Sequence, residues 1–285
     1  MKKIFIVLFA IIILGGVGYF GYNWYIGNKS SYITIDINPS VQLVLNGKEE
    51  VVEVVALNED ADIILSGLDL VGLSVEDATE DIINSATETG YIDEYGDDNE
   101  IVVTAYCDDE ELRLKIQDKV ESSTADTLDK KNIYYVLSTV TMTDDLKASA
   151  DEYDISNGKM LLVERAYTLD SSLDKDKLAD MSIKEIQDTI HDSVNARYEE
   201  QNMTQEQYQK QAKEQKEEKK QNTEAKVNQI INEVKTENQS QIENAGEDQQ
   251  LKVVEQLLIE KKEQIKSNAE QNGNSNTSNN TNGNK

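Results

Sequence analysis

Hydrophobic and polar residues alternate along residues 32–38, and this alternation predicts a β-strand. Ile33, Ile35 and Ile37 occupy every second position, which is the period of a strand with one buried face. Pro39, the only proline among the 285 residues, follows directly. Because proline cannot donate a hydrogen bond to a sheet, it indicates a strand end, an edge or a bulge at this point.

Two further apolar runs follow, over residues 41–45 and 51–56, and Asn46-Gly47 lies between them. An Asn-Gly pair between apolar runs is typical of a β-hairpin with a type I′ turn, since both central positions of that turn need positive φ. We therefore expect a hairpin here.

The next segment alternates between helical and strand patterns. A short helix is expected over residues 59–66, with Gly67 as its left-handed stop. A capping box at Ser74–Asp77 predicts a second helix that ends at Gly90. The remaining expected elements are a strand over 101–107, a helix over 108–120 and a strand over 132–142. The order β-β-β-α-β-α-β predicts an α/β (α+β) domain at residues 30–145, with a mixed sheet covered by helices.

The chain beyond residue 145 has a helical pattern. Residues 146–197 predict a small helical region, with helix starts at Ser156 and Ser182. Residues 198–266 are rich in Gln, Glu and Lys, with apolar residues at helical spacing, and predict long polar helices arranged as a hairpin or weak coiled coil. Residues 267–285 are almost free of apolar residues and are expected to be disordered.

Residues 1–29 predict a short cytoplasmic stub and a transmembrane helix. Lys2 and Lys3 precede an uncharged stretch that is long enough to cross a bilayer, which needs about 20 residues. Lys2 and Lys3 favour a cytoplasmic N-terminus, so the bulk of the chain would be extracytoplasmic, on a single-pass protein of the cell membrane. A cleaved signal peptide is the alternative, and the bulky aromatic residues at 19–25 favour the anchor over it.

Composition narrows the possible partners. The chain has 55 acidic and 28 basic residues, a net charge of −27, and such a surface repels nucleic acid. The single cysteine, Cys107, is in phase with the apolar residues of its strand, which predicts a buried thiol. The pattern shows neither the ligand set of a zinc site nor the spacing of a calcium loop, so we expect no metal and no cofactor.

Asn38-Pro39 is a candidate for self-cleavage. The usual succinimide of asparagine forms by attack of the next backbone N–H, which proline lacks. The Asn38 side-chain nitrogen can instead attack its own backbone carbonyl and expel the Pro39 amine, which would cut the chain. Asp36, two residues back on the same strand face, is a candidate base or orienting group, and Ser40 a candidate proton donor. The alternative is that these residues simply end a strand and form a turn.

Three segments resemble the extracytoplasmic middle domain of RsgI-type transmembrane anti-sigma factors. They are residues 31–41, with the sequence SYITIDINPSV, residues 55–60, with VALNED, and residues 65–72, with LSGLDLVG. The resemblance extends over roughly residues 31–190. It implies an α/β fold that cuts itself at the Asn-Pro bond, with the two pieces associated until an outside signal separates them.

The chain differs from that family at both ends. Only three residues precede the predicted anchor, where the family has a sigma-binding domain, so direct sigma-factor binding is not expected. Polar helices follow where the family often has other modules. We therefore expect a membrane-anchored RsgI-like module in cell-surface signalling or regulation, with at most single-turnover autoproteolysis and a protein or cell-wall component as partner. The alternative is a non-cleaving surface scaffolding or binding protein that acts through its C-terminal helices.

Overall fold

The computed structural model describes residues 31–107, 109–140, 143–200 and 205–278. The predicted anchor at residues 1–29 lies outside these ranges. Among the helices within them, none is long and apolar enough to span a membrane.

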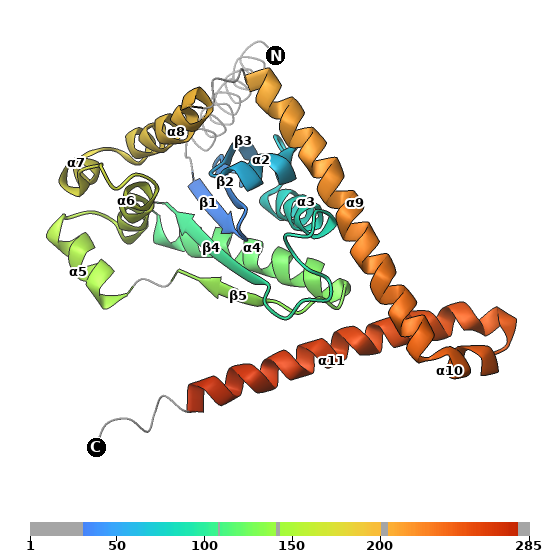
Figure 1. Cartoon of the computed structure of the whole chain (residues 1–285). Coiled ribbons are helices and arrows are strands. Elements are labelled where there is room, and N and C mark those ends of the chain that lie inside the picture. The colour runs from blue at the N-terminus through green and yellow to red at the C-terminus, as the bar shows by residue number, and fades with distance from the viewer. Residues whose placement is uncertain (1–30, 108, 141–142, 201–204, 279–285) are drawn as a thin grey trace, which may run out of the picture.

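The described chain is a mixed α/β structure with a five-stranded sheet (Figure 1). The strands are β1 (Ser31–Asp36), β2 (Ser40–Leu45), β3 (Val51–Ala56), β4 (Glu100–Tyr106) and β5 (Val136–Thr139). The helices up to residue 200 are α2 (Glu59–Leu65), α3 (Val75–Glu88), α4 (Glu110–Lys130), α5 (Asp144–Glu152), α6 (Asn157–Leu169), α7 (Lys175–Asp180) and α8 (Ile183–Glu200). The later elements are α9 (Gln205–Glu237), α10 (Gln239–Asn244), a 3₁₀ turn (Glu247–Gln249) and α11 (Gln250–Ser278).

Strand β1 is the central strand of the sheet. The strand order is β3-β2-β1-β4-β5, and β1 pairs antiparallel with both β2 and β4. The β4–β5 pair is parallel, so the sheet is mixed, as expected. The first segment with an alternating pattern therefore has hydrogen-bonded neighbours on both sides.

One face of the sheet carries the main core. Ile33 and Ile35 of β1 are fully buried there, together with Val41 and Leu43 of β2. Helices α2, α3 and α4 cover this face and contribute most of the remaining apolar side chains. The helical residues in this core are Ala61, Ile64, Val75, Ala78, Ile82, Ile83, Ala86, Ile116, Val120 and Leu128.

The second face of the sheet is also buried, contrary to the expectation of one buried face. Tyr32 is 5% exposed and Thr34 is fully buried. A second core joins Tyr32 and the β4 residue Tyr106 to apolar residues of α5, α6, α7 and α8. Helices α5–α8 thus form the other layer of the same structure (Figure 1).

Several local signals gave the correct boundaries. Gly67 and Gly90 have φ of 79° and 77° after α2 and α3, in the left-handed region that glycine adopts without strain. The Ser74 side chain accepts a hydrogen bond from Asp77 N and caps α3. Ser156 caps α6 in the same way, and Ser182 precedes α8 in a capping box with Glu185.

The hairpin between β2 and β3 is confirmed, but its turn differs from the predicted one. Asn46 O accepts a hydrogen bond from Glu49 N, and Glu49 has the positive φ of 65°. The Asn46 side-chain oxygen accepts from the backbone N–H groups of Lys48 and Glu50. These bonds stabilise a longer loop, and the Glu49 carboxylate pairs with Lys115 and Lys119 of α4.

Three predicted boundaries were wrong. Helix α4 continues to Lys130 instead of ending near residue 120, since Thr124 and Leu128 stay buried against the sheet side. Strand β5 covers only Val136–Thr139 of the expected 132–142, and Asn132 has a left-handed φ of 52°, which a strand does not adopt. Residues 141–142 lie outside the described ranges. Helix α11 extends to Ser278, beyond residue 266, where we expected the helical region to end.

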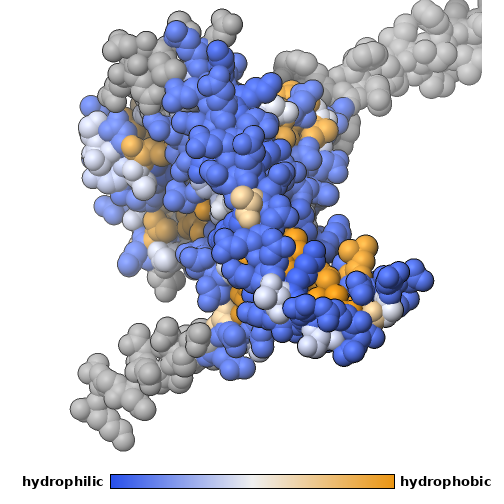
Figure 2. Space-filling view, turned by 45° about the vertical axis from the view of Figure 1, so that its right-hand side comes forward, coloured by the Kyte–Doolittle hydropathy of each residue, from blue (hydrophilic) through white to orange (hydrophobic). Residues whose placement is uncertain are grey.

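The C-terminal elements form an arm, defined here as α9, α10, the 3₁₀ turn and α11. Helix α9 lies along α2 and α3, and α11 meets α9 at the turn formed by α10 and then diverges from it (Figure 1). Long polar helices are thus present as predicted, whereas their arrangement as a hairpin or weak coiled coil stays a prediction. The side of the molecule that carries the arm is largely hydrophilic, with apolar residues in separate patches (Figure 2).

Gly158 in the first turn of α6 provides a test of how closely α6 packs against Cys107, at the end of β4. A Cβ atom there would lie 2.2 Å from the backbone oxygen of Cys107, whose thiol is buried and free as expected. Gly158→Ala should lower the free energy of unfolding by roughly 1–3 kcal/mol, although alanine normally favours a helix over glycine. Urea unfolding of the full chain measures this. Gly246→Ala, where nothing lies within 4 Å, is the control and should stay within about 0.5 kcal/mol of the parent. Equal stability of the two variants would contradict the close approach.

Candidate functional site

Asn38-Pro39 lies in the three-residue turn between β1 and β2. β1 ends at Asp36 and β2 begins at Ser40, and Ile37 N–H donates a hydrogen bond of 2.7 Å to Pro39 O. Asn38 is exposed and has a φ of 58°, in the left-handed region that asparagine tolerates better than most residues. Pro39 is buried. The candidate bond is therefore at the tip of a tight hairpin that begins with the central strand.

A polar cluster closes the base of this turn. Asp36 and Ser40 face each other in the register of β1 and β2, and the Ser40 hydroxyl donates to Asp36 Oδ1. Arg165 of α6 joins both: its Nη2 is 2.9 Å from Asp36 Oδ1 and 2.5 Å from Ser40 Oγ. The side chains of Arg165 and Asp36 are 19% and 26% exposed. Such a half-buried ion pair is less screened by solvent than a surface pair.

Further polar groups lie under this cluster on the same face of the sheet. The hydroxyl groups of Thr34 and Tyr106 are 3.4 Å apart, and both residues are buried. Burial raises the pKa of the Tyr106 phenol above its ordinary value, against the opposing effect of the nearby Arg165 guanidinium. Tyr106 therefore stays protonated at neutral pH and can donate a hydrogen bond.

Asn58 fixes the backbone of Ser40 from another side. Its side-chain oxygen accepts from Ser40 N at 3.1 Å and from Ala61 N at 2.9 Å, so it caps α2 and holds the start of β2 at once. Ser40 O accepts from Leu57 N at 2.9 Å. Both backbone groups of Ser40 and its hydroxyl are thus engaged, and the residue after the candidate bond is held firmly.

The structure brings together two of the four predicted site residues in direct contact. Asp36 and Ser40 form the base of the turn, and Asn38 and Pro39 form its tip. Asp36 is already bound to Arg165 and Ser40, which suits an orienting group.

Sequence reasoning missed two residues that position the turn. Asn58 directly precedes Glu59 and Asp60, which is the pattern of a helix N-cap, so that pattern could have identified its role on α2. Its bond to Ser40 depends on tertiary structure. Arg165 is 125 residues from Ser40, and its only local signal is a charge beside the apolar run at 160–163.

Comparison with known proteins identifies the domain. Residues 30–165 match the family model described as the anti-sigma factor RsgI-like central domain. That range contains the whole sheet, the Asn38-Pro39 turn and Arg165. It also crosses residue 145, where we expected a domain boundary, in agreement with the position of α6 on the sheet.

Individual relatives agree with this match. Anti-sigma-I factor RsgI7 of Acetivibrio thermocellus is 26% identical over 192 residues, which cover 67% of this chain and 35% of the relative. RsgI6 of the same organism is 28% identical over 167 residues, or 56% of this chain and 22% of the relative. Anti-sigma-I factor RsgI of Bacillus subtilis is 37% identical over 67 residues, or 23% of this chain and 18% of the relative.

The chain thus spans about a third or less of the length of these relatives. The family match, the relatives and the fold point to the same assignment. Residues 30–165 of this chain form an anti-sigma factor RsgI-like central domain.

Proposed function

We propose that this chain is a membrane-anchored, extracytoplasmic regulatory module that cuts itself once, at Asn38-Pro39. The observation that carries the proposal is the position of this bond, in a tight turn at the end of the central strand and with Ser40 held on three sides. The anchor is the apolar stretch at residues 1–29. The similarity to anti-sigma-I factors supports a role in signalling, and the proposal assigns no sigma-factor contact to the described residues.

The proposed cleavage conserves atoms and charge. The Asn38 side-chain nitrogen attacks the Asn38 backbone carbonyl carbon and forms a five-membered succinimide. The bond from that carbon to the Pro39 nitrogen breaks, and one proton moves from the attacking nitrogen to the leaving nitrogen. The products are an N-terminal piece that ends in the succinimide of Asn38 and a C-terminal piece that begins with Pro39.

Asp36 and Ser40 can carry that proton in two linked transfers. Asp36 accepts the proton that the Asn38 nitrogen loses, Ser40 gives its hydroxyl proton to Pro39 N, and Asp36 then restores the Ser40 hydroxyl through their hydrogen bond. Arg165 does not exchange a proton, because a guanidinium stays charged in proteins. It holds Asp36 and Ser40 in one orientation.

A cut at this bond leaves the two pieces joined by non-covalent contacts. The N-terminal piece keeps β1, which is bonded to β2 from Ser31↔Leu45 to Asp36↔Ser40 and to β4 from Tyr32↔Tyr106 to Asp36↔Val102. Burial of Ile33 and Ile35 contributes about 1.5–3 kcal/mol each. Extraction of β1 by an outside force would then release residues 39–285 from the anchor.

The second candidate function is a non-cleaving scaffold that assembles through the arm. Leu251 at the start of α11 is 70% exposed and borders a groove of about 510 Å³ with Ile242 and Val254. An exposed apolar side chain beside a groove favours self-association. Light scattering on the full chain and on Leu251→Glu separates the two functions, because only a scaffold loses mass in the variant.

The cleavage proposal predicts that Asn38→Ala remains a single polypeptide. The variant lacks the attacking nitrogen, whereas the parent should yield two species that divide after Asn38. Intact mass of the full chain under denaturing conditions, followed over days, measures this. Asn46→Ala alters the asparagine of the next hairpin and should be cut like the parent. Cleavage of Asn38→Ala at the same bond would refute the asparagine mechanism, and an uncut parent would leave the domain without this chemistry.

A second prediction concerns the Arg165–Asp36 pair. Arg165→Met should lower the free energy of unfolding by about 1–3 kcal/mol, because it leaves a half-buried carboxylate without its cation. The double variant Asp36→Asn, Arg165→Met should recover part of that loss in urea unfolding, with a coupling of about 0.5–3 kcal/mol. Lys184→Met, from an exposed pair with Asp188, is the control and should change stability by at most about 0.5 kcal/mol. Additive effects of the two site substitutions would show that the pair does not act as a unit.

A further inference from the structure

Several lysines of helix α9 contact the RsgI-like domain. Lys220 pairs with Glu88 at 2.6 Å, Lys226 pairs with Asp93 at 2.6 Å, and the Lys219 ammonium lies 4.2 Å from the centre of the Tyr91 ring. Thr223 lies against Gly90, where a Cβ atom would be 2.5 Å from its hydroxyl oxygen. The missing side chain at Gly90 thus lets α9 approach the end of α3.

The most buried of these contacts is that of Lys216. This residue is 6% exposed, and its Nζ donates to Ile64 O at 2.8 Å and to Ser66 O at 2.7 Å. These carbonyls lie at the C-terminal end of α2, which has no basic residue in its own last turn. A cation stabilises the carbonyl end of a helix, so the arm caps α2.

Helix α11 repeats this mode of binding at the end of α4. Lys262 is 12% exposed at its side chain, and its Nζ donates to Lys131 O at 3.0 Å and to Glu94 Oε2 at 2.9 Å. Lys131 is the C-cap residue of α4. The arm therefore binds two helix C-termini of the domain by the same physical means.

Helix α2 connects the arm to the candidate cleavage turn. Its N-cap, Asn58, accepts the Ser40 N–H, and its C-terminal carbonyls accept from Lys216. Seven residues of helix separate the two contacts, a distance of about 10 Å. One short rigid element therefore has the arm at one end and the residue after Pro39 at the other.

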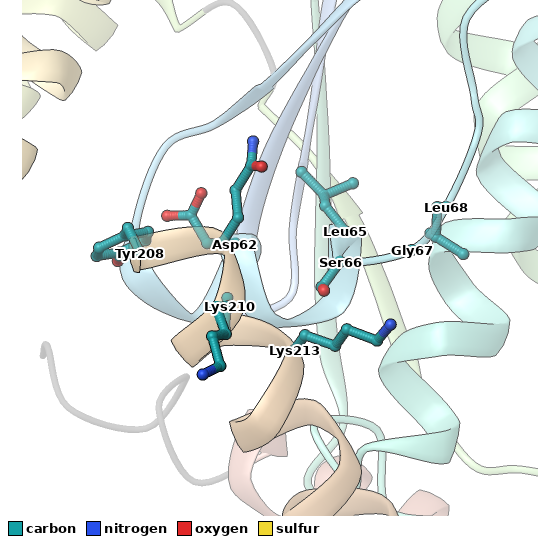
Figure 3. A pocket seen from close by; sticks show the side chains of 10 residues that line it. Asp62, Leu65, Ser66, Gly67, Leu68, Tyr208, Lys210 and Lys213 are labelled. Atoms are coloured by element: carbon teal, nitrogen blue, oxygen red, sulfur yellow. The ribbon is translucent and has the colours of Figure 1, made fainter. Parts of the chain in front are cut away.

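A cleft lies at this junction between the arm and the end of α2. It has a volume of about 550 Å³ and is lined by Leu65, Ser66, Gly67 and Leu68 at the end of α2 and by α9 residues that include Lys210 and Lys213 (Figure 3). The Lys210 side chain points away from the end of α2 in this view, and Lys210 pairs with Glu214 of its own helix. Lys210 is thus a matched control for Lys216.

We propose that the arm is a strap that regulates the Asn38-Pro39 turn, and that Lys216 is a positioning residue that acts through α2 and Asn58 on Ser40. With the strap docked, Ser40 stays in the orientation that cleavage needs. With the strap undocked, α2 frays and Ser40 N loses its hydrogen bond to the Asn58 side chain. The expected effect on the cleavage rate rests on the proposed self-cleavage. The coupling between Lys216 and Ser40 can also be measured in a chain that is not cut.

The first test is the rate of cleavage of freshly synthesised full chain, followed by intact mass under denaturing conditions. Lys216→Met should be cut about tenfold more slowly, the factor that corresponds to one lost charge-assisted hydrogen bond. Lys216→Arg keeps the donors and the charge and should restore most of the rate, and Lys210→Met should be cut like the parent. Equal rates for Lys216→Met and Lys210→Met would overturn the regulation of cleavage.

The second test is amide hydrogen exchange in Asn38→Ala, which separates a failure of the strap from a failure of cleavage. Added Lys216→Met should speed exchange at the Ser40 and Ala61 amides, both bound to Asn58, and leave the core amide of Val103 unchanged. An unchanged exchange rate at the Ser40 amide would overturn the strap proposal, even in a chain that is never cut. Lys220→Glu, which opposes Glu88 at an exposed site, should act in the same direction and replaces Lys216→Met if the latter does not fold.

The burial of Lys216 also predicts a pH dependence. Burial lowers the pKa of its ammonium to about 8, Lys220 adds to this effect, and Glu88 and Glu217 oppose it. The unfolded chain binds this proton up to a higher pH than the folded chain, so folded stability rises with pH from about 8 to about 10. The urea midpoint of the full chain relative to Lys216→Met should increase over that range. A difference that decreases would mean that the docked lysine gains, and does not lose, proton affinity.

Discussion

The pairing of β1 on both edges is the constraint on which the rest of the structure depends. β1 lies between β2 and β4, and its two faces contribute to two separate cores. Its loss would expose two rows of unpaired backbone groups and leave both layers of helices without the side chains that they pack on. The domain therefore depends on residues 31–36 for its structure, whether or not the chain is continuous after Asn38.

The polar cluster at the end of β1 is possible because of where it lies. Asp36 and Arg165 retain some exposure at the edge of the second core, which reduces the cost of removing two charges from water. Deeper on the same face the polar groups are neutral, as in the 2.7 Å hydrogen bond between the buried side chains of Gln42 and Gln187. The charged contacts thus gather at the turn, where they fix Ser40, and the neutral ones continue under α8.

Local signals in the sequence were sufficient to predict most helices and strands. Where a prediction was wrong, long-range contacts determined the structure. Gly67, Gly90 and the serine caps define helix ends through backbone chemistry within a few residues, so they could be read directly. The alternation of Ile33, Ile35 and Ile37 predicts only one buried face, because an alternating pattern cannot distinguish water from a second layer that satisfies polar groups. α6 supplies that layer from more than 120 residues away.

In the candidate site, too, local sequence identifies some residues and tertiary packing brings in the others. Asp36, Asn38, Pro39 and Ser40 are neighbours in sequence, and the chemistry of Asn-Pro singles them out. Arg165 and Asn58 reach Ser40 only through the packing of α6 and α2. The α4 extension was missed for a related reason, since the burial of Thr124 and Leu128 stabilises helix in a segment whose composition alone does not favour it.

Cleavage and retention depend on different parts of the molecule. The arm, α2 and Asn58 all follow Asn38 in the chain, so in a cut protein they belong to one piece and cannot hold the two pieces together. The contacts that cross the cut include the two ladders of β1, the packing of its side chains, the ion pair of Asp36 with Arg165 and the hydrogen bond from Ser40 to Asp36. In the proposed mechanism, the strap would change how fast the bond breaks, whereas the sheet and α6 would determine how long β1 stays in place afterwards. A signal that acts on the arm and a force that acts on β1 would control separate steps.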